Sequence, residues 1–275
     1  MSMKTRYMYL LMLPGILFLT VFMIIPIVLT IGTTFTDGSG ITLDGYLTFL
    51  KDRYFLDILF TTLRVSLLTT LICIILGFPA AYYISKLGGR MKAVLLLLTI
   101  FPLLTSSVVR SFSWMIIIGR NGLLNKMLLG MGIIHEPLDI LYTPTAIIIG
   151  LVHLFLPLII VSLVGVMENI QHDLLEAAES LGASKAIVFL KVVLPLCVPG
   201  LVIGSILVFV GSFTAYTTPA LLGGKQRVIS TFLYQNAITL NDWQVASIVA
   251  TIMIVITFAV IACMNALARK LNPKG

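Results

Sequence analysis

Long apolar runs dominate this chain and restrict it to one kind of fold. The 275 residues are 59% hydrophobic and 11% charged, whereas soluble domains average about 45–50% apolar residues. A run of about 20 apolar residues crosses a bilayer as a helix, because its backbone amides must find partners within their own segment. The sequence therefore predicts an all-α membrane protein with six transmembrane helices in a single domain, residues 1–275. The expected spans are residues 9–35, 58–85, 91–118, 144–167, 196–222 and 245–267.

The basic residues predict how the chain is oriented. Six spans place both termini on one side, which then carries ten of the 18 lysines and arginines, while the other side carries six. Because basic residues accumulate on the cytoplasmic side, we expect cytoplasmic termini and a cytoplasmic loop at residues 168–195. This bias also explains the net charge of +7 without a nucleic-acid partner. The ten residues are Lys4, Arg6, Lys86, Arg90, Lys92, Lys185, Lys191, Arg269, Lys270 and Lys274.

The chain lacks the sequence features of an energy source of its own. All eleven acidic residues lie in loops or at span ends, whereas ion-coupled carriers usually hold carboxylates inside the membrane. The stretch PALLGGKQ is no P-loop, because Pro219 replaces its first glycine and Gln226 its Ser or Thr. If transport is active, a partner must supply the energy.

Enzymatic and metal chemistry are also not predicted. The sequence shows no nucleophile with a base at a recognisable spacing and no cluster of metal ligands. Cys73, Cys197 and Cys263 stand singly in apolar segments, without the paired spacing of a zinc or redox site. We expect these cysteines to be packing residues and the chain to be no enzyme.

Residues 172–195 of the cytoplasmic loop predict two short helices joined by a bend. Asp173 is expected to cap the first helix, with Glu176 completing an Asp-x-x-Glu capping box. Gly182 ends that helix, and Ser184 is expected to cap the second, which runs to the end of the loop. The product is a rigid elbow at the membrane surface.

The first helix of this elbow carries a small apolar surface. Leu174, Ala178 and Leu181 share one face at helical spacing. On these grounds alone, the stretch fits either a capped connection between two spans or a docking surface for another protein.

The motif in this loop resembles a known signature. EAAESLG followed by VVLP is similar to the EAA signature of permease subunits of binding-protein-dependent ABC importers: Glu-Ala-Ala, three residues, Gly, nine residues, then Ile-x-Leu-Pro. Val192 stands at the isoleucine position. The resemblance implies the transmembrane domain of a type I ABC importer, whose coupling loop docks into a groove of a cytoplasmic ATPase. The matching residues, which would couple to that ATPase, are Glu176, Ala177, Ala178, Gly182, Leu194 and Pro195.

Further stretches extend the resemblance over nearly the whole chain. YFLDILFTTLRVSLLTTLICIILGFPAAYYISKL, FPLLTSSVVRSFSW and TPTAIIIGLVHLFLPLIIVSL look like permease subunits of spermidine/putrescine importers. The resemblance implies a bacterial inner-membrane protein that carries a polyamine. Its implied partners are a second related permease, an ATPase dimer that binds ATP and magnesium, an extracytoplasmic solute-binding protein, and membrane lipid. Asp242 and Trp243 match the family's Asp-Trp pair and are expected to help dock the binding protein, and no cofactor is implied in this chain.

Polar residues within the spans are candidates for the translocation path. A buried charge usually faces a cavity or a partner, so Arg110 fits either a path residue or an anchor that binds backbone carbonyls. The polar run after Gly200-x-x-x-Gly204 fits either a water-filled path or helix–helix contacts, and His153 fits a packed, hydrogen-bonded residue better than a solute ligand. The path candidates are Arg110, Trp114, Ser212, Thr214 and Tyr216.

The expected cargo and the span residues are in tension. A polyamine cation would meet carboxylates or aromatic rings, yet the spans hold arginines and no carboxylate. Trp114, Tyr216, Tyr82 and Tyr83 offer aromatic faces, and the binding protein is expected to set most of the selectivity. The open alternatives are an anionic or ferric solute in the same architecture, a membrane scaffold that binds a regulatory ATPase, and an ion-coupled carrier, which the missing acids disfavour.

Overall fold

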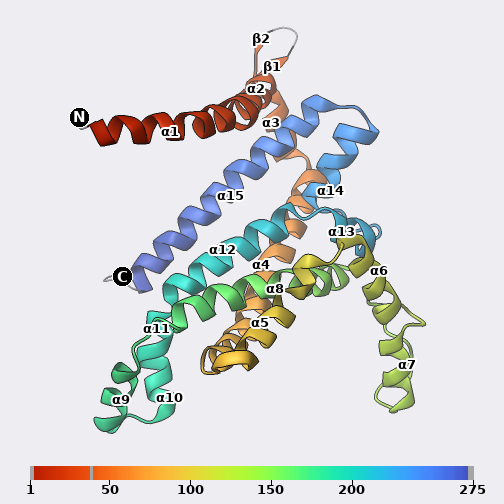
Figure 1. Cartoon of the computed structure of the whole chain (residues 1–275). Helices are drawn as coiled ribbons and strands as arrows, with labels where there is room; N and C mark the ends of the chain where they lie inside the picture. Colours follow the sequence, from red (N-terminus) through yellow and green to blue (C-terminus); the bar gives the residue numbers. More distant parts are fainter. Residues whose placement is uncertain (1–2, 38–39, 272–275) are drawn as a thin grey trace. The chain divides into compact units, whose positions relative to one another are not determined.

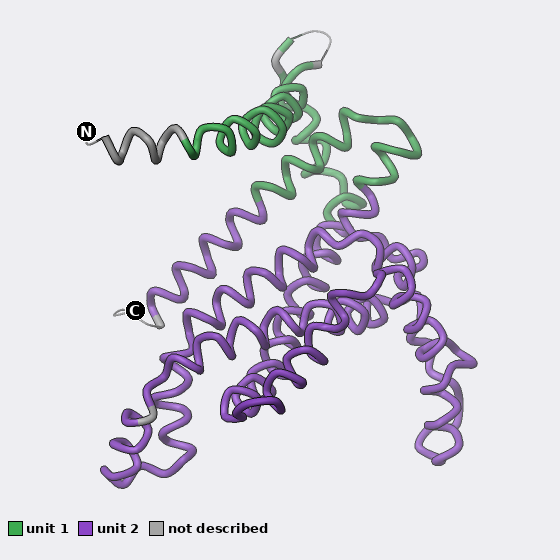
Figure 2. The backbone as a smooth tube through the Cα atoms, viewed as in Figure 1, with its two compact units in different colours: residues 1–56, 233–255 green, residues 57–232, 256–275 purple. Residues whose placement is uncertain are grey.

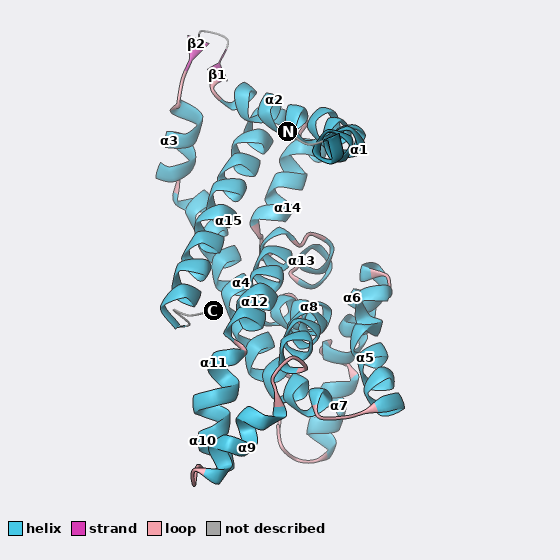
Figure 3. Ribbon diagram, turned by 60° about the vertical axis from the view of Figure 1, so that its left-hand side comes forward, coloured by secondary structure: helices cyan, strands magenta, loops and turns pink. Residues whose placement is uncertain are grey.

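The structure of the chain is a computed structural model that describes residues 3–37 and 40–271 (Figure 1). By their contacts the residues form two compact units: unit 1 comprises residues 1–56 and 233–255, and unit 2 comprises residues 57–232 and 256–275 (Figure 2). Regular structure in the described residues is helical apart from one small hairpin (Figure 3).

Unit 1 begins with one long apolar helical run. A π-helical turn, η1, interrupts this run just before Pro26, whose ring would clash with the carbonyl four residues earlier in a regular helix. The apolar window of the run has no buried residue within this chain, so lipid or another protein must cover it. The elements are α1 (Met3–Leu19), η1 (Thr20–Ile24), α2 (Ile25–Thr34), the antiparallel strands β1 (Thr36–Asp37) and β2 (Gly40–Ile41), α3 (Asp44–Lys51) and η3 (Gln235–Thr239).

Unit 2 holds the loop and most of the span candidates. Three helices belong to both units: α4 (Arg53–Ser85), α14 (Ile229–Tyr234) and α15 (Trp243–Leu271). The elements of unit 2 itself are α5 (Gly89–Leu104), α6 (Ser107–Ile118), α7 (Leu123–Gly130), α8 (Pro144–Met167), α9 (His172–Ser180), α10 (Lys185–Val188), η2 (Phe189–Val193), α11 (Leu194–Leu196), α12 (Val198–Thr214) and α13 (Thr217–Leu222).

Among the described residues, four helices are long and apolar enough to cross a bilayer alone, and two bent pairs raise the number to six. The four are Leu11–Thr34, Arg53–Ser85, Pro144–Met167 and Trp243–Lys270. The expected third and fifth spans differ from single straight helices. Residues 91–118 fold as α5 and α6, and the chain bends by 97° between α5 and the segment Ser107–Gly130, because the backbone of Thr105 and Ser106 is not helical. The fifth run begins at a 62° bend near Cys197, and its last residues form the separate helix α13.

Close helix packing builds the core of unit 2 around α8. Helix α12 lies along α8 (Figure 1), and the Ser162 hydroxyl donates a hydrogen bond of 2.7 Å to the Gly200 carbonyl. A Cβ atom on Gly204 would lie 3.0 Å from Cδ1 and 3.2 Å from Cα of Ile159. Small residues therefore let the two backbones approach, as the glycine motif predicts. Cys73 and Cys197 are fully buried in the same cluster, which confirms them as packing residues, whereas Cys263 of α15 is exposed and the prediction is wrong for it.

We predict that Gly204→Leu destabilises the chain, because the side chain would push α12 away from α8. Overpacking of this kind costs about 1–3 kcal/mol, and each kcal/mol lowers Tm by roughly 2–4 °C at this size. Thermal unfolding of the purified protein in detergent measures the change. Gly165→Leu is the matched control, since Gly165 of α8 is exposed and a Cβ atom added to it would have nothing within 4 Å. Equal melting of both variants would contradict the packing role.

Candidate functional site

The elbow between α8 and α12 is built around a left-handed glycine. Gly182 has φ +87° and follows α9 at the position where helices reverse. Its N–H donates to the Glu179 carbonyl at 2.9 Å, and the Ala183 N–H donates to the Ala178 carbonyl at 3.1 Å. These two bonds form a Schellman motif. The prediction that Gly182 ends the first helix is confirmed.

The second arm of the elbow runs without a loop towards α12. The Ser184 hydroxyl accepts a hydrogen bond of 3.4 Å from the Ile187 N–H, which confirms Ser184 as its cap. Helix α10 continues through the π-helical turn η2 into α11, which contains Pro195. The Phe189 ring packs edge-on against the rings of Phe78 and Tyr82 at centroid distances of 5.5 and 5.1 Å. The arm is thereby fixed to the end of α4.

The predicted capping box is wrong. Helix α9 begins at His172, with Gln171 as its cap residue, and no side chain makes a capping hydrogen bond. Asp173 therefore lies in the first turn, because the helix starts before it. There its negative carboxylate still stabilises α9, because it lies near the positive end of the helix dipole. Glu176 has no capping role.

The structure divides the EAA motif into an exposed part and a packed part. Glu176 and Ala177 are exposed and Ala178 is half-buried. Leu194 and Pro195 are half-buried, and Leu194 packs against the core of unit 2. The first part can meet a partner, whereas the second holds the arm in place.

Leu181 is a docking candidate that the motif match missed. Its side chain is 89% exposed at the tip of the elbow, and Leu174 on the same helix is 47% exposed. An exposed leucine beside a left-handed glycine is a signal that the sequence carries, because apolar side chains at a turn tip suggest a protein contact.

A cavity of about 580 Å³ lies beside α9. Glu176, Glu179 and Lys185 line it together with Tyr82 and Lys86. The Lys86 ammonium lies 3.9 Å from the centroid of the Tyr82 ring, so an internal cation already occupies this aromatic face. A further ion pair, between Lys92 of α5 and Glu168 at the end of α8, holds the border of the loop and was not expected from the sequence.

The structure separates the path candidates into different environments. Arg110 is buried and bonds backbone carbonyls, and the Trp114 indole N–H donates to His153 Nδ1 at 3.1 Å. His153 is thus a packed, hydrogen-bonded residue, as expected. At the end of α12, Thr214 and Tyr216 are exposed, whereas Ser212 is buried and its hydroxyl has no hydrogen-bond partner among the described residues. None of the five candidates lines the cavity beside α9.

The Asp-Trp pair lies at the start of α15. The Asp242 carboxylate accepts a hydrogen bond of 3.0 Å from the Val245 N–H and caps the helix. Trp243 is 60% exposed, and its indole N–H donates to the Asn241 side chain at 3.0 Å. An exposed, oriented indole suits a protein contact, and docking of the binding protein here stays a prediction.

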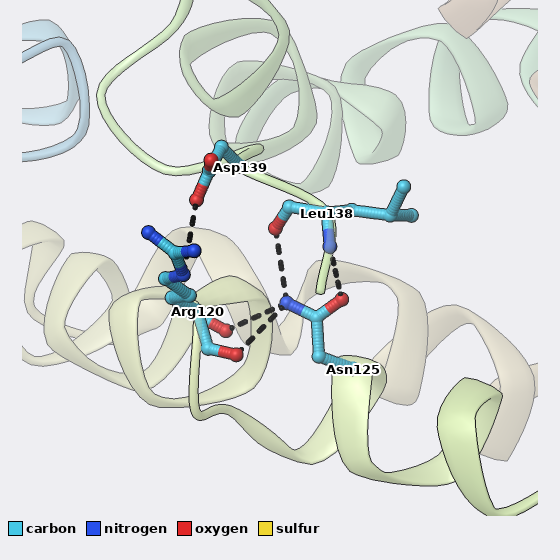
Figure 4. A network of polar contacts seen from close by, with 5 residues as sticks. Arg120, Asn125, Leu138 and Asp139 are labelled. Carbon is cyan, nitrogen blue, oxygen red and sulfur yellow. Dashed lines mark hydrogen bonds and ion pairs between the residues drawn. The ribbon is translucent and has the colours of Figure 1, made fainter. Parts of the chain in front are cut away.

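Asn125 organises a loop that sequence reasoning missed. Its side chain is buried and donates to the carbonyls of Gly119, Arg120 and Leu138 at 3.1, 3.2 and 3.0 Å (Figure 4). It also accepts a hydrogen bond of 2.8 Å from the Leu138 N–H. The exposed pair of Arg120 and Asp139 adds an ion pair of 3.8 Å, which contributes little. Asn125 thus fixes the segment between α7 and α8.

The chain is similar to known transport proteins. Residues 73–274 match the family described as the inner membrane component of binding-protein-dependent transport systems. The chain belongs to this family. It is therefore a multi-pass inner-membrane permease subunit, as the EAA signature indicated.

Individual relatives agree with this assignment. The permease is 33% identical to the spermidine/putrescine transport system permease protein PotB of Escherichia coli (strain K12) over 264 residues, 93% of this chain and 96% of that protein. PotB of Haemophilus influenzae is 34% identical over 237 residues, 83% of this chain and 82% of that protein. A bacterial ABC transporter that imports the acidic polysaccharide alginate has a chain of the same fold, with a TM-score of 0.78, 17% identity, and coverage of 97% of this chain and 96% of that chain. The predicted fold, the transmembrane domain of a type I ABC importer, is confirmed.

We predict that Gly182→Val loosens the elbow. A non-glycine residue in the left-handed region costs roughly 1–2 kcal/mol, and nothing lies within 4 Å of the added Cβ to change this cost. Hydrogen exchange of the amides at positions 181–183 should become about tenfold faster, and less so for Gly182→Asn, which tolerates this conformation. Gly88→Val, at an open turn with ordinary φ, should leave these amides unchanged. Unchanged hydrogen-exchange protection of these amides in Gly182→Val would show that the turn does not depend on a left-handed glycine.

Proposed function

We propose that this permease forms part of the route by which a polyamine, spermidine or putrescine, enters a bacterial cell through an ATP-driven importer. The similarity to the PotB proteins along nearly the whole chain carries this choice of solute. The chain itself catalyses no reaction, and a partner ATPase binds ATP with magnesium and hydrolyses it.

The elbow is the surface on which this ATPase docks. Glu176 and Ala177 are exposed, and the small side chains of Ala177, Ala178 and Gly182 let a partner backbone approach closely. The 89% exposed Leu181 supplies an apolar anchor for a groove. Leu194 and Pro195 keep the second arm against the core, so that movement of the elbow reaches α12.

The remaining partners follow from the family and the exposed surfaces. A second, related permease completes the pore, and an extracytoplasmic binding protein docks near Asp242 and Trp243. The chain acts as one transmembrane domain, residues 1–275, with both termini in the cytoplasm. Of the residues behind this orientation, Lys274 and the side chains of Lys4 and Arg6 lie outside the described part.

The polar end of α12 is the part of this chain that we assign to the path. Thr214 and Tyr216 are exposed within the chain, and Tyr216 offers an aromatic face to a cation. Ser212, near the end of α12, has a buried hydroxyl without a hydrogen-bond partner among the described residues. Trp114 is held by His153 and acts at the border of this path.

Deletion of this gene should abolish uptake of labelled spermidine and putrescine in cells that lack other polyamine importers. Wild-type protein should restore uptake fully, because the rest of the importer is intact. Unchanged polyamine uptake in the deletion strain would refute the assignment of the solute but not the assignment to the permease family. Uptake of anionic solutes would then be measured next.

Glu176→Lys and Leu181→Asp should each lower polyamine uptake at least about tenfold, since both remove a buried contact of the docked elbow. Co-purification of the ATPase with the permease should fall in parallel, while the amount of permease in the membrane stays normal. Glu136→Lys is the matched charge reversal on another loop and should leave co-purification unchanged. Full ATPase binding by both elbow variants would refute the docking surface.

A further inference from the structure

The bend between α5 and α6 leaves backbone carbonyls without helical partners. Helix α5 ends at Leu104, and the last carbonyls of a helix have no N–H four residues later. Within a bilayer, unpaired backbone groups are costly. A 97° bend inside an apolar run therefore needs a group that pairs with these carbonyls.

Arg110 is that group. Its Nη1 atom donates to the carbonyl oxygens of Pro102 and Thr105 at 2.5 and 3.3 Å, and it lies 3.2 Å from Thr105 Oγ1. The Thr105 hydroxyl itself donates to the Pro102 carbonyl at 2.9 Å. A positive charge at the C-terminal end of α5 also suits the helix dipole.

The position of Arg110 keeps its charge inside the protein. The residue is only 6% exposed, and no carboxylate of the described chain forms an ion pair with it. The oxygens of the bend therefore accept the hydrogen bonds of Nη1, while the buried Nε has no hydrogen-bond partner among the described residues.

A second contact, one turn further along α6, fixes this helix to α8. Trp114 lies one turn after Arg110 on the same helical face. Its indole N–H donates to His153 of α8, and the two rings meet edge to face at 5.6 Å. Helix α6 is thus held to α5 through Arg110 and to α8 through Trp114.

We infer that Arg110 is a positioning residue that holds the α5–α6 bend, and that the bend withdraws its charge from the solute path. This assignment resolves the tension between an arginine in the span and a polycationic cargo. The part that concerns the charge rests on the proposed polyamine function, whereas the part that concerns the bend does not.

Spin labels test the bend directly in the complete importer, reconstituted in lipid nanodiscs. Labels at Leu98 of α5 and Ile116 of α6, both exposed, report the distance across the bend. Cys263 is replaced by serine, while Cys73 and Cys197 are buried and can stay. Arg110→Met should shift and broaden the distance distribution, and Thr105→Val, which keeps the charge, should do so to a smaller extent. Arg64→Gln, at an exposed arginine of α4, should leave it unchanged.

Uptake of two polyamines of different charge tests whether the Arg110 charge is withdrawn from the solute path. Arg110→Met should slow spermidine and putrescine uptake by the same factor, since loosening the bend lowers the fraction of importers in the working conformation whichever polyamine is carried. KM for each polyamine should stay unchanged. If the guanidinium faced the path, its removal would favour the more highly charged spermidine, and Thr105→Val would have no effect.

The outcomes separate the two claims. An unchanged label distance in both Arg110→Met and Thr105→Val overturns the positioning role. If Arg110→Met yields too little complex to measure, an unchanged distance in Thr105→Val alone overturns it. A changed ratio of spermidine to putrescine uptake overturns the withdrawal of the charge. A shifted label distance in an importer that carries neither polyamine supports the bend and refutes the proposed solute instead.

Discussion

The need to pair every backbone amide and carbonyl inside the bilayer governs this structure. Regular helices meet it automatically, so each departure from a regular helix requires a local solution. At Pro26 and Pro195 the chain widens into a π-helical turn. At Thr105 it bends by 97°, and a buried arginine pairs with the freed carbonyls. In unit 2, the departure at Pro195 lies in the arm that we assign to coupling, and the departure at Thr105 is the bend that Arg110 holds.

Features with local causes could be predicted from the sequence. Gly182 ends α9 because only a left-handed residue closes a Schellman motif without strain, and Ser184 caps the next helix because its hydroxyl reaches an N–H three residues later. The long apolar runs predicted the helical membrane fold for a similar reason, since the requirement for backbone pairing acts within each segment. The exposed Glu176 and the packed Leu194 share one motif, yet only the structure shows that they play different parts.

Features that depend on distant or finely balanced groups could not be predicted. The cap at Asp173 failed because the extended backbone of Gln171 starts α9 two residues earlier than predicted. The bend at Thr105 was hidden, because the apolar pattern continues through it and membrane helices tolerate proline. The role of Asn125 depends on Leu138, thirteen positions later, which no spacing rule connects.

The elbow and the polar end of α12 belong to one mechanical element. From Lys185 the chain is helical through η2 and α11, and after the bend near Cys197 it continues as α12 to Thr214. Each of these two helical segments is stiff along its length because of its backbone hydrogen bonds, and the two meet at the 62° bend. Gly200 and Gly204 present no side chain that must disengage from α8, and the hydrogen bond from Ser162 to the Gly200 carbonyl is a polar contact that a movement of α12 would have to break. Movement of α12 driven by an ATPase at α9 would displace Ser212, whose buried hydroxyl has no hydrogen-bond partner among the described residues.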